Sequence, residues 1–358
     1  MSSTDPHEGR SGPRVLVARL DSFGDVLVAG PAVRAIAAGA SHVTMLCGPH
    51  GAPAAELLPG IDRVRVWAAP WVTETPGALD DTALVAFRAM VEEEGIDEAV
   101  VLTSFHQSPL PLAVLLRLAG VGRVSGASVD HPGSLLDVRL RPGEDLPEDI
   151  PEPERALRIA AAAGFLLPPE DDGRLGVLPP GAPPDDVAAL GRYVVVHPGA
   201  SVEARSWPAA QHRALVTAYA ERGVPVVVTG SPGERALTAA VAAGAVAGAA
   251  PVLDLGGRTT PAGLAAVLAG AEVVVVGNTG PAHLAAAVGA RIVSLFSPVV
   301  PAAKWAPSAE HVELLGDQSA ACRLTRARDC PVPGHPCLTS VSVDDVLAAH
   351  ERLTAPRT

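Results

Sequence analysis

The stretch VLVARLDSFGD, residues 15–25, joins an apolar run to a glycine turn that carries an aspartate on either side. The next residues, VLVAGPAVRAIAA, place apolar side chains at helical spacing, so the sequence predicts a buried strand leading into a helix. Asp21 and Asp25 would then lie at the carboxyl end of that strand. A carboxylate beside a buried strand is costly unless it is paired or has a chemical role. We therefore expect a functional acid in this connection.

The same alternation continues through both halves of the chain and predicts βαβ units with parallel sheets. Residues 166–190, rich in proline and acids, separate the two series of strands. We expect an α/β protein with two Rossmann-like, doubly wound domains that face each other across a cleft. The expected parts are a flexible tail (1–13), an N-terminal Rossmann-like domain (14–165), a linker (166–190), a C-terminal Rossmann-like domain (191–340) and a C-terminal helix that can pack back on the N-terminal domain (341–358).

Composition narrows the classes of function. The 358 residues are 48% hydrophobic, which supports globular cores, and the net charge of -12 argues against a nucleic-acid partner. The N-terminal residues lack the apolar core of a signal peptide, and no apolar stretch is strong enough for a membrane span. We therefore expect a cytoplasmic protein without a transmembrane segment, with a peripheral position at the inner membrane face left open.

Three of the four cysteines, Cys322, Cys330 and Cys337, cluster near the C-terminus. Their spacing lacks the close pairs that are typical of zinc fingers, so reduced structural thiols are favoured and no metal site is predicted. A four-ligand set completed by His335 stays the alternative.

Candidate ligand-binding residues follow the predicted strands of the second domain. Asn278, Thr279 and Gly280 precede a helix, whose bare N-terminal N–H groups and neighbouring hydroxyl suit a phosphate. A simple helix cap is the alternative for Asn278 or Thr279. His283, in the first turns of that helix, either orients the loop or is a structural histidine.

Three other strand ends carry similar residues. After the strand at 193–196, Ser201 and Arg205 can bind a diphosphate, with a solvated loop arginine as the alternative. The turn that contains Gly230 is followed by Glu234, which can accept hydrogen bonds from ribose hydroxyls or can be an ordinary helix-start acid. The turn at Leu255 and Gly256 offers backbone groups and a flat apolar surface to a base.

Several nucleotide-dependent classes are excluded by missing motifs. No predicted strand is followed by G-x-G-x-x-G, and no Walker lysine loop occurs, so a dehydrogenase or a P-loop enzyme is not expected. The chain also lacks Asp-x-Asp, the motif by which many sugar transferases hold a divalent metal. We expect no cofactor.

The blocks RLDSFGDVLVAGPAVRAI, HPGAS…ARSWP, the segment from LGGRTT through GNTGPAH and the cysteine-rich tail resemble, in order, those of the glycosyltransferases of family 9, the heptosyltransferase-like enzymes. The resemblance implies a GT-B fold, in which residues 14–165 bind the acceptor and residues 191–340 bind the nucleotide-sugar donor. It also implies an inverting, metal-independent reaction in which Asp25 is the general base. It also implies that Arg205 and Ser201 contact the donor phosphates, and that Asn278 stands where the family has an aspartate. After the fourth strand, His106 and Gln107 replace the family's acidic and basic pair, and we take them as acceptor contacts.

The predicted function is therefore transfer of a sugar, with heptose as a candidate, from a nucleotide diphosphate to an acceptor hydroxyl. An ADP-sugar is the favoured donor, and the acceptor can be a glycan, a glycolipid or a small natural product. Two alternatives stay open: a nucleotide-sugar epimerase of the same architecture, and a nucleotide-sugar-binding protein without catalysis.

Overall fold

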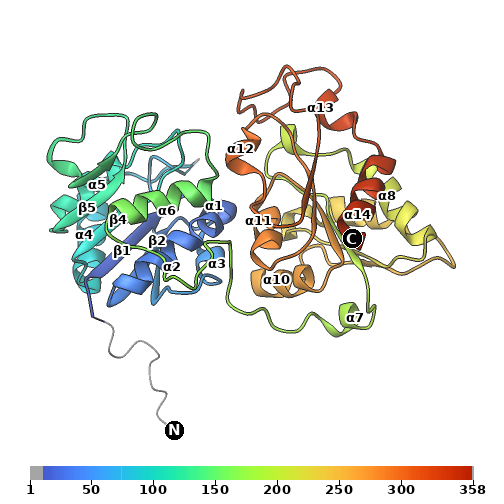
Figure 1. Cartoon of the computed structure of the whole chain (residues 1–358), viewed down its shortest axis with the longest axis horizontal. Coiled ribbons are helices and arrows are strands. Elements are labelled where there is room, and N and C mark those ends of the chain that lie inside the picture. Colours follow the sequence, from blue (N-terminus) through green and yellow to red (C-terminus); the bar gives the residue numbers. More distant parts are fainter. Residues whose placement is uncertain (1–10, 74, 357–358) are drawn as a thin grey trace, which may run out of the picture. The chain divides into compact units, whose positions relative to one another are not determined.

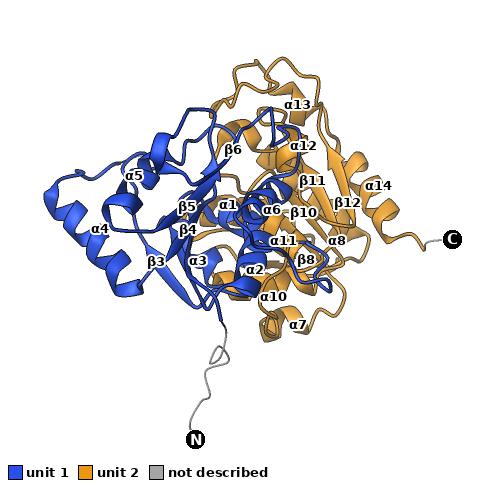
Figure 2. Cartoon of the chain, turned by 60° about the vertical axis from the view of Figure 1, so that its left-hand side comes forward, with its two compact units in different colours: residues 1–174 blue, residues 175–358 orange. Residues whose placement is uncertain are grey.

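The computed structural model describes residues 11–73 and 75–356. Internal contacts divide the chain into unit 1, residues 1–174, and unit 2, residues 175–358, coloured blue and orange in Figure 2. This boundary falls inside the segment predicted as a linker. Residues 1–10 of the predicted tail lie outside the described residues.

Unit 1 is built on a parallel sheet that, in the described residues, has six strands in the order β3-β2-β1-β4-β5-β6. The chain starts in the middle of the sheet, moves to one edge, and returns to continue on the other side of β1. This is the strand order of a doubly wound Rossmann-like sheet. The strands are β1 (Arg14–Arg19), β2 (His42–Cys47), β3 (Arg63–Val66), β4 (Glu98–Val101), β5 (Arg123–Ala127) and β6 (Val138–Leu140).

Helices cover both faces of this sheet (Figure 1). Helices α4 and α5 pack on the face that carries Leu16 and Ala18, and α2 contacts α6 in a second layer. The helices are α1 (Phe23–Val28), α2 (Gly30–Gly39), α3 (Ala52–Ala55), α4 (Asp81–Glu94), α5 (Leu110–Leu118), η1 (Gly133–Leu135) and α6 (Glu152–Ala162).

Unit 2 repeats the same topology. Its described residues form a second six-stranded parallel sheet in the order β12-β11-β10-β7-β8-β9. The strands are β7 (Val194–His197), β8 (Val226–Val228), β9 (Val252–Asp254), β10 (Val273–Gly277), β11 (Ile292–Leu295) and β12 (Val312–Leu315).

The helices of unit 2 also form layers. Helix α14 packs against α8 and against β10, β11 and β12, while α10 and α11 contact each other. Whether α14 also reaches unit 1 stays a prediction. The helices are α7 (Asp185–Ala188), η2 (Glu203–Arg205), α8 (Ala209–Glu221), η3 (Pro232–Glu234), α9 (Arg235–Ala242), α10 (Pro261–Ala269), α11 (Gly280–Ala287), α12 (Ala302–Trp305), α13 (Pro336–Thr339) and α14 (Val343–Thr354).

Strands with helices on both faces are apolar along their whole length, which is why they could be predicted from the sequence. All five residues of β10, VVVVG, are buried. By contrast, β6 and β12 are edge strands without a fully buried residue, and neither was expected from the sequence. The predicted fold class, α/β with doubly wound units, is confirmed. The way in which the two domains face each other stays a prediction.

No helix in the described part of the chain is long and apolar enough to cross a bilayer.

Leu16, in the centre of β1, has no exposed surface and belongs to the core beneath α4 and α5. We predict that Leu16→Ala lowers the free energy of unfolding by about 2–5 kcal/mol, because it removes buried methyl groups and leaves a cavity. Urea unfolding measures this change. Leu118→Ala is the matched control, because Leu118 is 65% exposed; its effect should stay within about 0.5 kcal/mol. Equal effects would show that the β1 core contributes no more than the surface.

Candidate active site

The site in unit 1 lies at the point where the strand order reverses, between β1 and β4. In open parallel sheets, ligands bind outside the carboxyl ends of the strands at such a point. Asp25 follows β1, whereas His106 and Gln107 follow β4. The topology therefore brings the predicted base and the predicted acceptor contacts to the same edge of one sheet.

The centre of this site is Arg19, the last residue of β1, which is only 2% exposed. Its Nη2 donates hydrogen bonds to Asp25 Oδ1 at 2.8 Å and to Ser104 Oγ at 2.7 Å. Its guanidinium also pairs with Asp21 at 3.0 Å and with Glu152 at 3.6 Å. One buried cation therefore connects the segment after β1, the segment after β4 and the start of α6.

Asp25 is held from two sides. It is the third residue of α1 and forms a capping box with Ser22, whose backbone N–H and hydroxyl both donate to Asp25 Oδ2. Its other oxygen accepts the hydrogen bond from Arg19. The side chain still keeps 17% of its surface exposed. The carboxylate is thus oriented by its own helix and remains reachable.

The two aspartates titrate in opposite directions. Burial alone would raise the pKa of Asp25, but the charge of Arg19 and the hydrogen bonds from Ser22 and Arg19 outweigh it, and the pKa is lowered. Burial and the neighbouring Asp25 raise the pKa of Asp21, against the effect of Arg19. Arg19 and Ser22 therefore favour the ionised form of Asp25, whereas burial and the charge of Asp25 disfavour the ionised form of Asp21.

Gln107 and His106 differ in their surroundings. Gln107 donates through Nε2 to Asp21, and its Oε1 accepts from Ser104 N at 3.2 Å. Gln107 therefore belongs to the network around Arg19. His106 is exposed and its ring meets Phe105 edge-on at 5.2 Å.

Sequence reasoning missed the most buried members of this network, Arg19, Ser104 and Glu152. Arg19 directly follows the apolar run VLVA, and this position could have indicated a buried charge network. A buried guanidinium needs carboxylate partners. Glu152 lies 133 positions further along the chain, so its pairing with Arg19 could be known only from the fold.

In unit 2, the predicted donor residues follow four neighbouring strands. The order β10-β7-β8-β9 is continuous in the sheet, and the switch point lies between β10 and β7. All four strands are parallel, so their carboxyl ends form one edge. The predicted residues along this edge are Asn278, Thr279, Gly280 and His283 after β10, Ser201 and Arg205 after β7, Gly230 and Glu234 after β8, and Leu255 and Gly256 after β9.

Arg205 ends the short η2 turn and lies against β10. A Cβ atom added at Gly277 would stand 3.3 Å from the Arg205 carbonyl oxygen, so a glycine allows this approach. Arg205 is half-buried, while Ser201 is exposed. The turn therefore brings the Arg205 backbone close to the residue that precedes Asn278.

The segment after β10 combines a helix N-terminus with a buried amide. Thr279 takes the N-cap position of α11, but its side chain makes no capping hydrogen bond. Asn278 is 5% exposed, and its Nδ2 has no hydrogen-bond partner among the described residues. His283 is buried, with its ring 6.4 Å from that of Trp305. The uncapped helix start and the unpartnered amide both leave donors for a ligand.

Glu234 lies between two of these loops. Its Oε2 accepts from Ser231 N at 2.7 Å, which is the capping-box geometry of a helix-start acid. Its carboxylate also packs on Gly199, where any side chain would collide with it. The position of Glu234 is thus compatible with a ribose contact and with the role of a helix-start acid.

The turn after β9 uses its backbone N–H groups internally. Those of Leu255, Gly256 and Gly257 donate to Val228 O, Asp254 Oδ1 and Gly230 O, respectively, each at 2.8 Å. A nucleobase that contacts this turn would therefore be bound by backbone carbonyl acceptors and by packing.

The cysteine cluster is part of the core of unit 2. Cys322 and Cys337 are buried, with Cys330 packed against them, and burial raises the pKa of the Cys337 thiol to about 11. Within residues 11–73 and 75–356, no group of three or more His, Cys, Asp or Glu residues is arranged to hold a metal ion.

Residues 167–334 match the model of glycosyltransferase family 9 (heptosyltransferase). The match agrees with the resemblance that the motifs of this segment show to that family.

Solved structures support the fold over nearly the whole length. The Escherichia coli ADP-heptose lipopolysaccharide heptosyltransferase II is 18% identical, with a TM-score of 0.71 and coverage of 95% of this chain and 98% of that one. A family 9 glycosyltransferase from Veillonella parvula is 16% identical, with a TM-score of 0.71 over 96% and 97% of the chains.

The E. coli heptosyltransferase WaaC, solved with ADP-2-deoxy-2-fluoro heptose, is 21% identical, with a TM-score of 0.67 over 95% and 99%. At these identities the similarity shows the two-unit GT-B architecture alone. No curated protein matches the chain.

Two buried histidines lie at the end of β7 and in the first turn of α8. His197 ends β7, and its Nδ1 lies 3.0 Å from Thr229 Oγ1. Burial lowers the pKa of His197 to about 4, although the charge of Glu234 opposes this, and burial lowers the pKa of His212 to about 3. Both rings are therefore neutral in the folded protein near neutral pH.

We predict that unit 2 loses stability as the pH falls from 6.5 toward about 4. In this pH window His197 is protonated in the unfolded chain but stays neutral in the folded chain. The free energy of unfolding therefore decreases with decreasing pH. His197→Asn, whose amide can still pair with Thr229, should reduce the slope by roughly 1.4 kcal/mol per pH unit. Urea unfolding across this window measures it, and an unchanged slope would mean that His197 is already protonated in the fold.

Proposed function

We propose that this chain is an inverting, metal-independent glycosyltransferase that moves a heptose from an ADP-linked donor to an acceptor hydroxyl, with Asp25 as the general base. The observation that carries the proposal is the ionised Asp25 carboxylate, oriented by Ser22 and Arg19 at the switch point of unit 1.

The reaction needs one proton acceptor. The acceptor hydroxyl transfers its proton to Asp25 while its oxygen forms a bond to the anomeric carbon of the donor. The bond between that carbon and the diphosphate oxygen breaks, and the electron pair leaves with the nucleotide. Displacement in a single step inverts the anomeric configuration.

Arg19 has a positioning role in this scheme. It holds one oxygen of Asp25 and leaves the second oxygen with Ser22, so the carboxylate cannot rotate freely. Its charge also keeps the pKa of Asp25 low, which keeps the base deprotonated before each turnover.

The leaving diphosphate needs positive charge or hydrogen-bond donors. We assign this task to Arg205, to Ser201 and to the N–H groups at the start of α11, beside Thr279 and Gly280. Support comes from the position of these residues after adjacent strands β7 and β10. The lack of an Asp-x-Asp motif in the sequence favours stabilisation by these groups without a bound metal.

The adenine of the donor is supported by the relatives. WaaC has been solved with ADP and with ADP-2-deoxy-2-fluoro heptose. We propose that the adenine ring lies on the turn of Leu255 and Gly256. Glu234 then accepts hydrogen bonds from the ribose hydroxyls, and the Nδ2 of Asn278 donates to the sugar or phosphate. A cytoplasmic location is part of the same proposal.

The role of Asp25 as the general base can be tested by comparing two neighbouring aspartates. We predict that Asp25→Asn lowers transfer by roughly 10²–10⁴-fold, because a positioned base is lost, while ADP binding is retained. Asp21→Asn is the matched control, since Asp21 also pairs with Arg19, and it should lose far less. ADP release from ADP-heptose in the presence of cell extract reports turnover. Near-normal turnover in Asp25→Asn, or a greater loss in Asp21→Asn, would place the base elsewhere.

A second prediction concerns the nucleotide. ADP should bind at least ten-fold more tightly than UDP or GDP, a difference of about 1.4 kcal/mol, if the donor is ADP-linked. Calorimetric titration of the three nucleotides against the full chain measures this preference. Tighter binding of UDP or GDP would contradict the heptose donor while leaving sugar transfer itself possible.

A further inference from the structure

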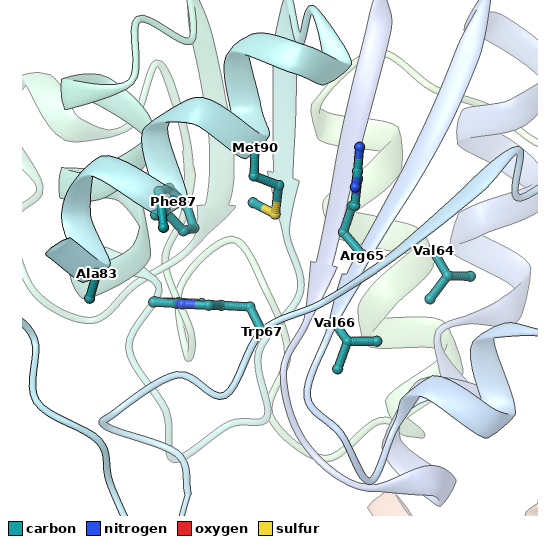
Figure 3. A pocket seen from close by; sticks show the side chains of 8 residues that line it. Val64, Arg65, Val66, Trp67, Ala83, Phe87 and Met90 are labelled. Carbon is teal, nitrogen blue, oxygen red and sulfur yellow. The ribbon is translucent and has the colours of Figure 1, made fainter.

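Unit 1 contains a cavity that the proposed reaction does not use. It has a volume of about 440 Å³ and lies between the edge strand β3 and helix α4. In Figure 3, Trp67 lies beneath Phe87 and Met90 of α4, with Val64 and Val66 on the side of the strand. This volume is in the range of sites that bind small organic molecules.

Aromatic side chains are concentrated here in a chain that has few of them. Only four tryptophans occur in the sequence, and Trp67 and Trp71 are two of them. The ring of Trp67 meets that of Trp71 edge-on at 5.3 Å and that of Phe87 at 4.8 Å. Trp71 is 36% exposed and Val66 is 53% exposed. Apolar surface left in contact with solvent beside a cavity is typical of a binding site.

The charge of the cavity wall is already neutralised. Arg65 is the charged residue of the lining. Its guanidinium pairs with Glu93 at 2.7 Å and also with Glu94, both on α4. An anionic ligand would have to compete with two carboxylates for this cation, so the cavity favours an uncharged group.

The cavity lies at the same edge of the sheet as Arg19. In the register of the parallel strands, Arg19 is opposite Cys47, and Cys47 is opposite Val66. The residue after Val66, Trp67, donates its backbone N–H to Cys47 O at 2.9 Å. Two strand spacings separate Arg19 from Val66, which is roughly 10 Å. The cavity therefore lies two strands away from Arg19, the residue that holds Asp25, so a group bound in it is remote from the reacting hydroxyl.

We propose that this cavity binds a flat, uncharged aromatic group of the acceptor, an aryl aglycone remote from the hydroxyl that receives the sugar. Tilted and edge-on ring contacts like those of Trp67 and Phe87 extend naturally to a further ring. Binding energy from such a remote group positions the reacting hydroxyl. The assignment of this aromatic group to the acceptor rests on the proposed function. Binding of an aromatic ring in the cavity can be tested without any sugar transfer.

The experiment measures binding by calorimetry with three glucosides that differ only in the aglycone: phenyl, hexyl and methyl β-D-glucoside. We expect the phenyl compound to bind the full chain at least ten-fold more tightly than the methyl compound. Ala83→Leu fills the cavity from α4 and should abolish the preference. Ala89→Leu is the matched control, because Ala89 is exposed on the same helix and does not line the cavity.

Each result decides the matter. Equal binding of the phenyl and methyl compounds, or a preference that survives Ala83→Leu, overturns the proposal. Tighter binding of the hexyl compound assigns the cavity to an acyl chain instead. A change of oligomeric state in Ala83→Leu, measured by sedimentation, would make this surface an interface between copies. If Ala83→Leu unfolds, Ala86→Leu provides the same test from an exposed lining position.

The same titration separates this inference from the proposed function. Asp25→Asn should keep the preference for the phenyl compound, because Asp25 lies outside the cavity. If the unmodified chain prefers the phenyl compound but transfers no sugar, the result supports the cavity and counts against the transferase. A lost preference in an active transferase would do the reverse.

Discussion

The organisation of unit 1 depends on the buried guanidinium group of Arg19. Arg19 is 2% exposed and is surrounded by Asp21, Asp25 and Glu152. A charge taken out of water is costly, and removal of one member of such a cluster leaves the others uncompensated. Because the partners of Arg19 belong to the segment after β1 and to α6, the cluster joins parts of the chain that are distant in sequence. It also leaves Asp25 ionised at the edge where parallel sheets bind ligands.

The two units use the same strand order for different chemistry. Unit 1 places carboxylates and an arginine at its switch point, a combination suited to proton transfer. Unit 2 places a helix start, a buried amide and an arginine-bearing turn at the corresponding point, a combination suited to an anion. Small residues make the second arrangement possible, since Gly199 and Gly277 allow neighbouring loops to approach where a side chain would collide or crowd.

The extent to which structure could be anticipated follows burial. Strands such as β10 are covered on both faces and read as unbroken valine runs, so their type and order were predictable. The edge strands β6 and β12 are partly exposed and carry no such run. The positions of Asp25 and of Asn278 were predictable for the same reason, because each lies in the connection that follows a buried strand. The internal use of the N–H groups around Leu255 was not, because it depends on the contacts that β9 makes with β8.

The sequence by itself determined the α/β alternation, the family resemblance and the polar residues at the strand ends, because hydrophobic periodicity and turn residues are local properties. Only the tertiary structure decided that the pKa values of two nearby aspartates shift in opposite directions, that Glu152 and Ser104 meet Arg19, and that Trp67 and Phe87 border a cavity. The physical reason is that burial and electrostatic pairing arise between residues far apart along the chain, whose distances are set when the helices pack on the sheet.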